Sequence, residues 1–562
     1  MKCFRNATRN MGVVGELGSF SWTNKRWWIP PLVITLFLLG VQGFFGSAGL
    51  EKAQQLQSNG LTVDVGCGTP SGTLFNLEGS FNPVPQNEPP VDFLYNRIPP
   101  FNGGNTDLVV QHGNDWRGLG FVPYSETTAI YVHRSDSSAC RPDFEMGNAL
   151  IGRFRSGFDP QVVADPTNDQ FLFTDVRFGS GGGTGVGLRR IAAANLLNPS
   201  VCPSGTLSLS QASTCSGPNA IVVDQSNNTA DWTGLAQDLR QVGSGTGAGD
   251  IYVANVSKIP HSSNDAGVVH LTVCKALFTS ASDCSQTISI STESSVNAPR
   301  VSVVPGGPNQ GTITVTYIAY DNTSSGCTGS SFCNDIMFVV CSPNGAPTAP
   351  LCGASILVAV EHNPVYNLGG NRFPVYTLPV HANRADGSTG QTTFVVWTRC
   401  KVDATAYPFS GDACPDADIL TAWSADLGNT WTQFQLATNS KHQFQPAIAV
   451  DASTGITNIA YNTMVDSYNT VDQVVLQQIP AGTRTLGQAI WVTRVGNIAS
   501  ADPHLQVSQL YGDYIGIAVH GTGAPGGSRA YVGHTKDVRL GTYVQSGVTA
   551  PDLNNHISLV IY

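Results

Sequence analysis

Charged residues are scarce in this sequence. Asp, Glu, Lys and Arg make up 12% of the 562 residues and the net charge is -10. Typical soluble proteins carry roughly 25% charged residues. No block of Lys and Arg offsets the acidity, which excludes nucleic acid as a partner because phosphate binding requires clustered cations. So few charges also disfavour surface helices that depend on ion pairs.

Several catalytic and cofactor motifs are missing as well. The sequence contains no CxxC, no GxSxG and no HExxH, and its 11 His residues show no metal-ligand spacing. Zinc ribbons, thioredoxin-type redox sites, serine hydrolase elbows and zincins therefore have no support. The glycine-rich stretch at 242–250 lacks the Lys and the helix of a phosphate loop and is predicted to be a hairpin turn. No cofactor is evident, and a structural calcium ion stays an open alternative.

The first 48 residues are predicted to be an export signal or an N-terminal membrane anchor. Five cations precede and flank an apolar run at 27–49, in which Gly46 and Ala48 have a cleavage-like spacing. An uncleaved anchor is the alternative, because the run approaches the roughly 20 residues of a spanning helix. Both readings place the rest of the chain outside the cytoplasm, whether secreted, periplasmic or on the cell surface. The protein is then expected to contact a membrane only through this segment, if the segment is not cleaved.

Cysteine spacing supports export. Outside the leader there are twelve cysteines, and ten form near-neighbour pairs. The predicted disulfides are Cys202–Cys215, Cys274–Cys284, Cys327–Cys333, Cys341–Cys352 and Cys400–Cys414, with Cys67–Cys140 as a sixth. Such a set is expected in an oxidising compartment. In that compartment Asn227, Asn255 and Asn322 would be glycosylation sequons if the host modifies them.

Glycine is abundant, at 60 residues, and the chain repeats itself. Similar phrases recur 67 to 75 residues apart, anchored on Pro89, Pro160, Trp232, Pro299, Pro374, Pro446 and Asp513. Each unit contains four short strand-like segments separated by Gly, Asn or Asp turns, with no long amphipathic helix. Repeats of this length and content are typical of propeller blades.

The predicted fold is therefore all-β: a β-propeller of four-stranded blades, stapled by disulfides. The count favours seven blades, and six is the alternative if one terminal unit only completes a shared blade. The propeller is assigned to residues 87–562, and residues 49–86 are expected to be a linker or N-terminal extension.

The stretch SADLGNTW at 424–431 is expected to be the turn between the third and fourth strands of the fifth blade. In blades two to four the same hairpin holds a short-range cysteine pair. Its spaced residues, Ser424, Asp426, Gly428, Thr430 and Trp431, resemble the Asp box of the sialidase and BNR-repeat superfamily. The Asp box occurs in enzymes and non-enzymes alike, so the resemblance implies a fold and a structural role for the turn.

Two further stretches resemble sialidases. Arg97 begins an Arg-Ile-Pro whose arginine, in that family, grips the substrate carboxylate, and Arg117 lies about where the family has a further arginine. The resemblance implies a tyrosine nucleophile, for which Tyr511 is a poorly matching candidate. No suitable aspartate follows Arg117 in its loop, so the sialidase mechanism is not assigned.

Blade geometry predicts where a site would lie. The starts of the first strands and the loops joining strands two and three share one face, here called the top face, whereas the Asp box lies on the bottom face. The site residues assigned on these grounds and by resemblance are Asp115, Tyr511 and Glu88 as catalytic candidates and Arg97, Arg117, Arg372, Asp159, Asp231 and Asp513 for substrate binding. Converging carboxylates and arginines are typical of a polar sugar site or a metal site.

Two functions follow from these observations. The first is an exported, sialidase-like propeller that acts on or binds glycans at the top of its axis, with exo-glycosidase activity as the finer version. The alternative is a non-catalytic propeller that binds an extracellular protein or a polysaccharide.

Overall fold

The described residues of the compact unit Gly60–Tyr562 form a β-propeller. The computed structural model describes residues 61–67, 86–87, 90–98, 106–115, 127–134, 144–147, 157–178, 184–198, 200–202, 205–206, 214–215, 220–224, 230–258, 267–320, 334–361, 376–400, 414, 416–436, 441–465, 471–493, 497–498, 514–521, 528–545 and 548–562. In these residues the strands form seven blades of almost entirely antiparallel strands, as the repeat predicted.

The first four blades follow chain order from the inner strand outward. Blade 1 consists of β3 (Val91–Ile98), β4 (Thr106–Asp115), β5 (Thr127–Arg134) and β6 (Phe144–Gly147), with the short β2 (Gln86–Asn87) and β10 (Gly205–Thr206). Blade 2 consists of β7 (Gly157–Asp165), β8 (Gln170–Phe178), β9 (Thr184–Ala192) and β11 (Ala220–Asp224), with helix α5 (Ala193–Leu196). Blade 3 consists of β12 (Ala230–Gln237), β13 (Ile251–Lys258), β14 (Gly267–Cys274) and β15 (Ile288–Ser289), with the 3-10 turn η3 (Ala281–Asp283). Blade 4 consists of β16 (Val296–Val303), β17 (Ile313–Tyr320), β18 (Asn334–Ser342), β19 (Leu351–Cys352) and β20 (Ile356–Glu361).

The last three blades complete the series. Blade 5 consists of β21 (Val380–Asp386), β22 (Gly390–Cys400), β23 (Ala417–Ser424) and β24 (Thr432–Gln435). Blade 6 consists of β25 (Gln443–Val450), β26 (Thr457–Met464), β27 (Val471–Ile479), β28 (Ala489–Trp491) and β29 (Asn497–Ile498). Blade 7 consists of β30 (Gly516–His520), β31 (Arg529–Gln545), β32 (Val548–Ile561) and β1 (Leu61–Cys67).

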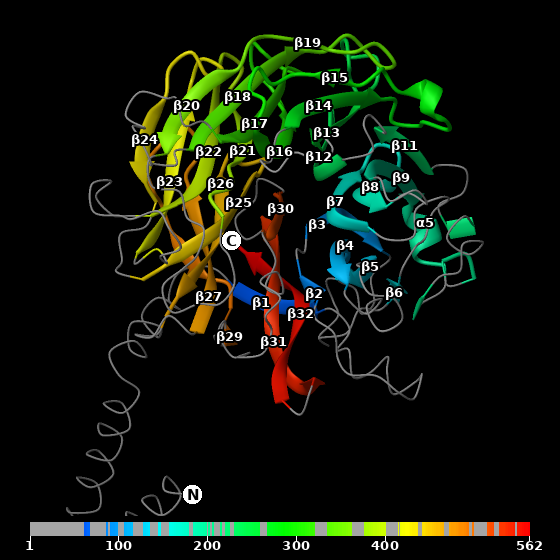
Figure 1. Ribbon diagram of the computed structural model, residues 1–562, viewed down its shortest axis with the longest axis vertical. Coiled ribbons are helices and arrows are strands. Elements are labelled where there is room, and N and C mark those ends of the chain that lie inside the picture. The colour runs from blue at the N-terminus through cyan, green and yellow to red at the C-terminus, as the bar shows by residue number, and fades with distance from the viewer. Residues whose placement is uncertain are drawn as a thin grey trace, which may run out of the picture. The chain divides into compact units, whose positions relative to one another are not determined.

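The two ends of the Gly60–Tyr562 unit meet in blade 7. Strand β1 pairs antiparallel with β32 and supplies the outermost strand, and Figure 1 shows the blue β1 beside the red β32. Residues 61–67, within the segment predicted to be a linker or N-terminal extension, thus supply a strand of blade 7. First strands of successive blades contact one another, and β30 contacts β3, so the series closes on itself. Closure leaves few exposed strand edges.

Buried side chains on both faces of the blades hold the propeller together. Strand β17 is buried along seven of its eight residues because blades 3 and 5 cover its two faces. Tyr317 packs in the seam between blades 3 and 4, whereas Ile318 points to the opposite seam. Alternate residues of the middle strands therefore serve different seams, which explains their nearly continuous apolar sequence.

Aspartates terminate several first strands at the bottom face. The Asp165 carboxylate accepts hydrogen bonds from the Asn168 amide (3.1 Å) and from Gln170 Nε2 (2.8 Å). The Asp451 carboxylate accepts bonds from the Ser453 amide (2.9 Å) and, across the next seam, from Ser528 Oγ (2.8 Å). These turns are the Asp-containing turns between strand-like segments of the sequence repeat. Asp favours such turns because its carboxylate readily accepts a hydrogen bond from the backbone amide two residues ahead.

The SADLGNTW stretch forms the turn between β23 and β24. Asp426 Oδ1 accepts bonds from Ser424 Oγ (2.7 Å) and the Thr430 amide (2.9 Å), and Oδ2 accepts one from Thr430 Oγ1 (2.7 Å). Gly428 has a φ of 90°, which a side chain would strain. Trp431 packs edge-on against Phe338 of blade 4 at 5.3 Å, so the turn also ties two blades together.

Four predicted disulfides are present in the described residues: Cys202–Cys215, Cys274–Cys284, Cys341–Cys352 and Cys400–Cys414. The first three close the hairpins between third and fourth strands of blades 2 to 4, as expected. Disulfides of this kind are typical of an oxidising location. The pairs Cys327–Cys333 and Cys67–Cys140 lie outside the described side chains, as does the leader. No helix among the described residues has the length and apolarity to cross a membrane.

Candidate functional site at the central cavity

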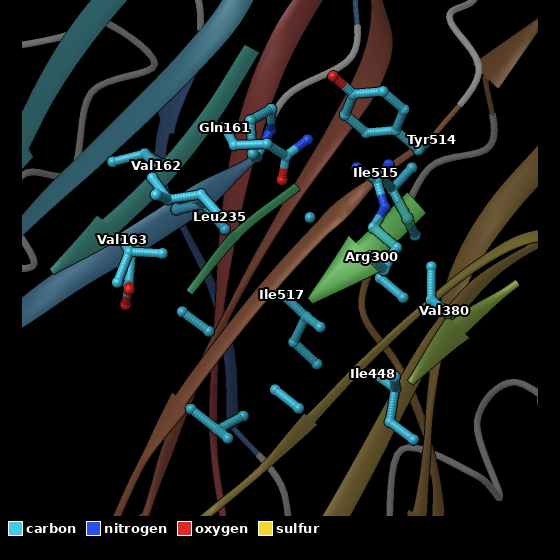
Figure 2. Close-up of a pocket in the computed structure, with 18 of the residues that line it drawn as sticks. Gln161, Val162, Val163, Leu235, Arg300, Val380, Ile448, Tyr514, Ile515 and Ile517 are labelled. Carbon is cyan, nitrogen blue, oxygen red and sulfur yellow. The ribbon is translucent and has the colours of Figure 1, made fainter. Parts of the chain in front are cut away.

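A cavity of about 350 Å³ lies where the first strands of all seven blades converge. Much of its lining is aliphatic, including Val162, Leu235, Ile448 and Ile517 (Figure 2). Its volume is at the lower end of the range for small-molecule sites, which is roughly 300 to 1,000 Å³.

Tyr514 crosses the cavity at the top face. It lies two residues before the first strand of blade 7, yet its hydroxyl donates a 2.9 Å hydrogen bond to the carbonyl of Pro160 in blade 2. Its ring also lies 6.0 Å from that of Trp232 in blade 3. One side chain thus joins three blades at the end of the cavity where first strands begin.

Arg300 of blade 4 contacts the same ring. Its guanidinium carbon lies 4.6 Å from the Tyr514 ring centroid, a cation–π geometry, and Nη1 donates a 2.8 Å bond to the Thr233 carbonyl. Gln161 lines the cavity nearby, and its Nε2 atom is buried with no hydrogen-bond partner in the described part of the chain. Figure 2 shows Gln161, Arg300 and Tyr514 together at one end, with aliphatic side chains beyond them.

Backbone bulges mark the same end in four blades. Asp159, Trp232, Ala298 and Gln445 all have φ between 48° and 51°, and each lies at a register shift in its first strand. Prolines follow three of them, which is why Pro anchored the repeat. Left-handed non-glycine residues carry strain and cluster at functional sites, and bulges re-aim neighbouring side chains.

Two further titratable groups line the cavity. Asp92 accepts hydrogen bonds from the amides of Ala164 (2.7 Å) and Phe93 (2.8 Å), but burial dominates and raises its pKa to about 6. His381 is hydrogen-bonded at each ring nitrogen, to Thr314 and Thr316, both at 2.8 Å. Burial lowers the pKa of His381 to about 3, so the ring is neutral.

Two predicted substrate-binding aspartates lie at the top face, and each has a partner within the protein. Asp159 is buried, and its carboxylate accepts a 3.2 Å bond from the Trp232 amide, which fixes the next bulge. Asp231 forms an ion pair with Lys258 in the same blade. Trp232, at the same end of blade 3, is 6% exposed and is packed in the seam between blades 3 and 4.

Arg97 lies at the other face. It is near the end of β3 and forms a two-pronged ion pair with Asp169 in the turn between β7 and β8. Because first strands end at the bottom face, the structure does not bring Arg97 together with Tyr514 or Arg300. Its carboxylate-binding role stays a prediction from resemblance.

The remaining candidates lie outside the residues whose side chains are described: Glu88, Asp115, Arg117, Arg372, Tyr511 and Asp513. Asp115 ends β4, where its backbone pairs with Gln86 and Thr127. In sequence, Asp513 immediately precedes Tyr514 and Tyr511 lies three residues before it, whereas Glu88 lies two residues before Pro90. Their catalytic and binding roles remain predictions.

A hydrogen-bonded tyrosine–glutamate pair occurs away from the cavity. Tyr317 donates a 2.5 Å hydrogen bond to Glu293 Oε2, and Ser355 completes the group. Tyr317 is fully buried in the seam between blades 3 and 4, and burial raises its pKa far above the ordinary value. This arrangement fastens two blades and does not line the cavity.

No cluster of three or more His, Cys, Asp or Glu side chains suited to a metal ion occurs in the described part of the chain.

Comparison with known proteins finds only weak structural similarities. No protein-family model and no curated protein matches this sequence. Among solved structures, a Hadza microbial sialidase is 10% identical over 77% of this chain and 73% of its own, with a TM-score of 0.36. An ulvan lyase bound to a sulfated disaccharide is 9% identical over 70% and 79%, with a TM-score of 0.31. AofleA from Arthrobotrys oligospora is 10% identical over 73% and 89%, also at 0.31. Similarity this weak carries no argument about function.

Sequence reasoning missed Tyr514, Arg300 and Gln161. A signal existed for two of them: Gln161 and Arg300 each directly follow a repeat proline, Pro160 and Pro299, and therefore occupy equivalent blade positions. The repeated proline indicates where the first strand of each blade lies. The residue after it, Gln161 or Arg300, lines the cavity at the propeller axis.

Proposed function

We propose that this chain is an exported propeller that binds a carboxylated saccharide at the top end of its central cavity. The observation that supports it most is the convergence of Arg300, Gln161 and Tyr514 at one end of an otherwise aliphatic cavity. A planar guanidinium suits a carboxylate, and an amide beside it suits a hydroxyl or carboxylate oxygen.

The strained bulges support the same location. Four first strands place a left-handed residue at this end, and the surrounding hydrogen bonds of Asp159 and Thr233 hold two of the bulges in place. Strained backbone that is held in place in this way is typical of ligand sites, because the strain lowers stability without improving the packing of the core.

Glu88, Asp115, Arg117, Arg372, Tyr511 and Asp513 belong to this proposal as flanking groups. We assign them to contacts with the saccharide beyond its carboxylate, on the sequence argument that first-strand starts and second-to-third loops share the top face. Arg97 is not included, since Asp169 already occupies its guanidinium fork.

A binding screen of the purified full chain against acidic and neutral oligosaccharides tests the proposal. We expect uronate- or sialate-bearing glycans to bind, and Arg300→Met to abolish binding. Binding that is restricted to neutral glycans, or unchanged in Arg300→Met, would contradict it. Fluorogenic glycosides of the same acidic sugars then report whether the bound saccharide is cleaved.

A further inference from the structure

A compact cluster of charged side chains is buried between blades 1 and 2. Asp175 and Arg177 project from β8, and Arg189 projects from the adjacent β9. These three residues are 1%, 4% and 1% exposed. Blade 1 contributes His112 and Thr128, and the five residues are called the seam cluster below.

The carboxylate at the centre of the cluster is already used by three donors. Asp175 Oδ1 accepts a bond from Arg177 Nε (2.5 Å), and Oδ2 accepts bonds from Arg189 Nη2 (2.8 Å) and Thr128 Oγ1 (3.0 Å). Burial raises the pKa of Asp175, but the two guanidinium groups outweigh it and hold the pKa near 2. Asp175 is therefore ionised.

Among the described residues, the cluster carries one positive charge more than it neutralises. Two guanidinium groups face one carboxylate, and His112 is neutral because burial lowers its pKa to about 3. Arg177 Nη2 and Arg189 Nε are buried, and neither has a hydrogen-bond partner among the described residues. A buried charge without a counter-charge strongly destabilises the folded state, so native proteins pair such groups with an opposite charge.

The backbone of β9 fixes this arrangement. A Cβ atom on Gly187 would lie 2.4 Å from Arg177 Nε and 2.9 Å from Asp175 Oδ1, so only glycine admits the ion pair at this position. On the blade 1 side, His112 Nδ1 donates a 3.1 Å bond to the carbonyl of Gln161, the cavity residue labelled in Figure 2. The seam cluster thus lies against the backbone of the cavity wall.

We propose that the seam cluster binds a small monovalent inorganic anion such as chloride. Arg177 Nη2 and Arg189 Nε are the donors, and the anion supplies the missing negative charge between blades 1 and 2. The site is independent of the saccharide proposal, because neither arginine lines the central cavity. Its expected effect is to stabilise the seam, since an anion that binds only the folded state raises the free energy of unfolding.

Thermal unfolding of the full chain tests this site directly. We expect Tm to rise saturably with chloride or bromide when gluconate keeps ionic strength constant, and Arg189→Met to remove the rise. Arg190→Met is the matched control, because Arg190 is the next residue of β9 and bonds instead to the Phe278 carbonyl (2.9 Å). The control should retain the halide response.

Bromide in crystals of the unaltered protein gives a second measurement that does not depend on a variant folding. An anomalous peak within hydrogen-bonding distance of Arg177 Nη2 and Arg189 Nε is expected. The proposal is overturned if the seam contains only a bridging water, or if the halide response is unsaturable and equal in Arg189→Met and Arg190→Met.

Discussion

Arg300 and Tyr514 form a stacked pair across the propeller axis, with the guanidinium carbon 4.6 Å from the ring centroid. The two residues come from blades 4 and 7, and the tyrosine hydroxyl reaches blade 2 through Pro160. The pair therefore does two things: it ties three blades together at the top face, and it holds a cation in a fixed position beside the cavity.

Removing the Tyr514 hydroxyl should weaken the propeller modestly. Tyr514→Phe keeps the ring contacts but leaves the Pro160 carbonyl unpaired, and we expect the free energy of unfolding to fall by about 1 kcal/mol. Denaturant unfolding measures the change. Tyr461→Phe is the control, because that hydroxyl has no hydrogen-bond partner in the described structure, and it should change stability less. Equal effects of the two variants would contradict the bridging role.

The Asp box turn should contribute stability through Asp426. Asp426→Ala removes three acceptor contacts to Ser424 and Thr430, and we expect a loss of about 1 to 2 kcal/mol with no loss of ligand binding, because the turn lies on the bottom face. Although partial burial raises the pKa of Asp426, the hydrogen bonds from Thr430 and Ser424 hold it below its usual value.

That lowered pKa gives the Asp426 contribution a pH dependence. The carboxylate stabilises the folded state above the unfolded pKa, and the stabilisation is lost as pH falls through the folded pKa. Unfolding measured from pH 6 to 3 should therefore show a smaller difference between wild type and Asp426→Ala at the acidic end. A constant difference would show that the charge is not involved.

Asp92 should act in the opposite direction. Burial raises its pKa to about 6, so the folded state retains a proton that the unfolded chain, with a pKa near 3.8, releases. The free energy of unfolding is then expected to fall as pH rises from about 4 to about 6. Asp92→Asn should flatten this part of the profile. An unchanged slope in the variant would mean that Asp92 titrates normally.

Asn255 should not be glycosylated, although its sequence is a sequon. Its side chain is fully buried in the described structure, and Nδ2 donates a 2.8 Å bond to the Asp224 carboxylate. Expression in a glycosylating host followed by peptide mass spectrometry should find this asparagine unmodified. Full occupancy at Asn255 would contradict the register of β13.

The architecture was predictable because it depends on patterns that are local in sequence. Each hairpin is indicated by local signals: a proline near a strand start, an Asp or Gly turn, or a cysteine pair about ten residues apart. Seven repetitions of these signals predict seven blades. Strand β1 escaped prediction because its partner, β32, is roughly 490 residues away in the chain.

The site was less predictable because its residues meet only through closure of the propeller. Tyr514 and Pro160 are 354 residues apart. Arg97 has a recognisable sequence context, but the direction of its side chain depends on an ion pair with Asp169, which belongs to the next blade. The sequence resemblance points to arginines by their motif. The polar residues that line the cavity are instead those that follow the bulge in a first strand.

Calorimetric titration of the full chain with an acidic oligosaccharide, comparing Arg300→Met with Arg97→Met, tests the central claim most directly. The structure-based proposal predicts that Arg300→Met loses binding and that Arg97→Met, on the bottom face, retains it. The reverse result, with binding lost only in Arg97→Met, would contradict a saccharide site at the Tyr514 end of the cavity.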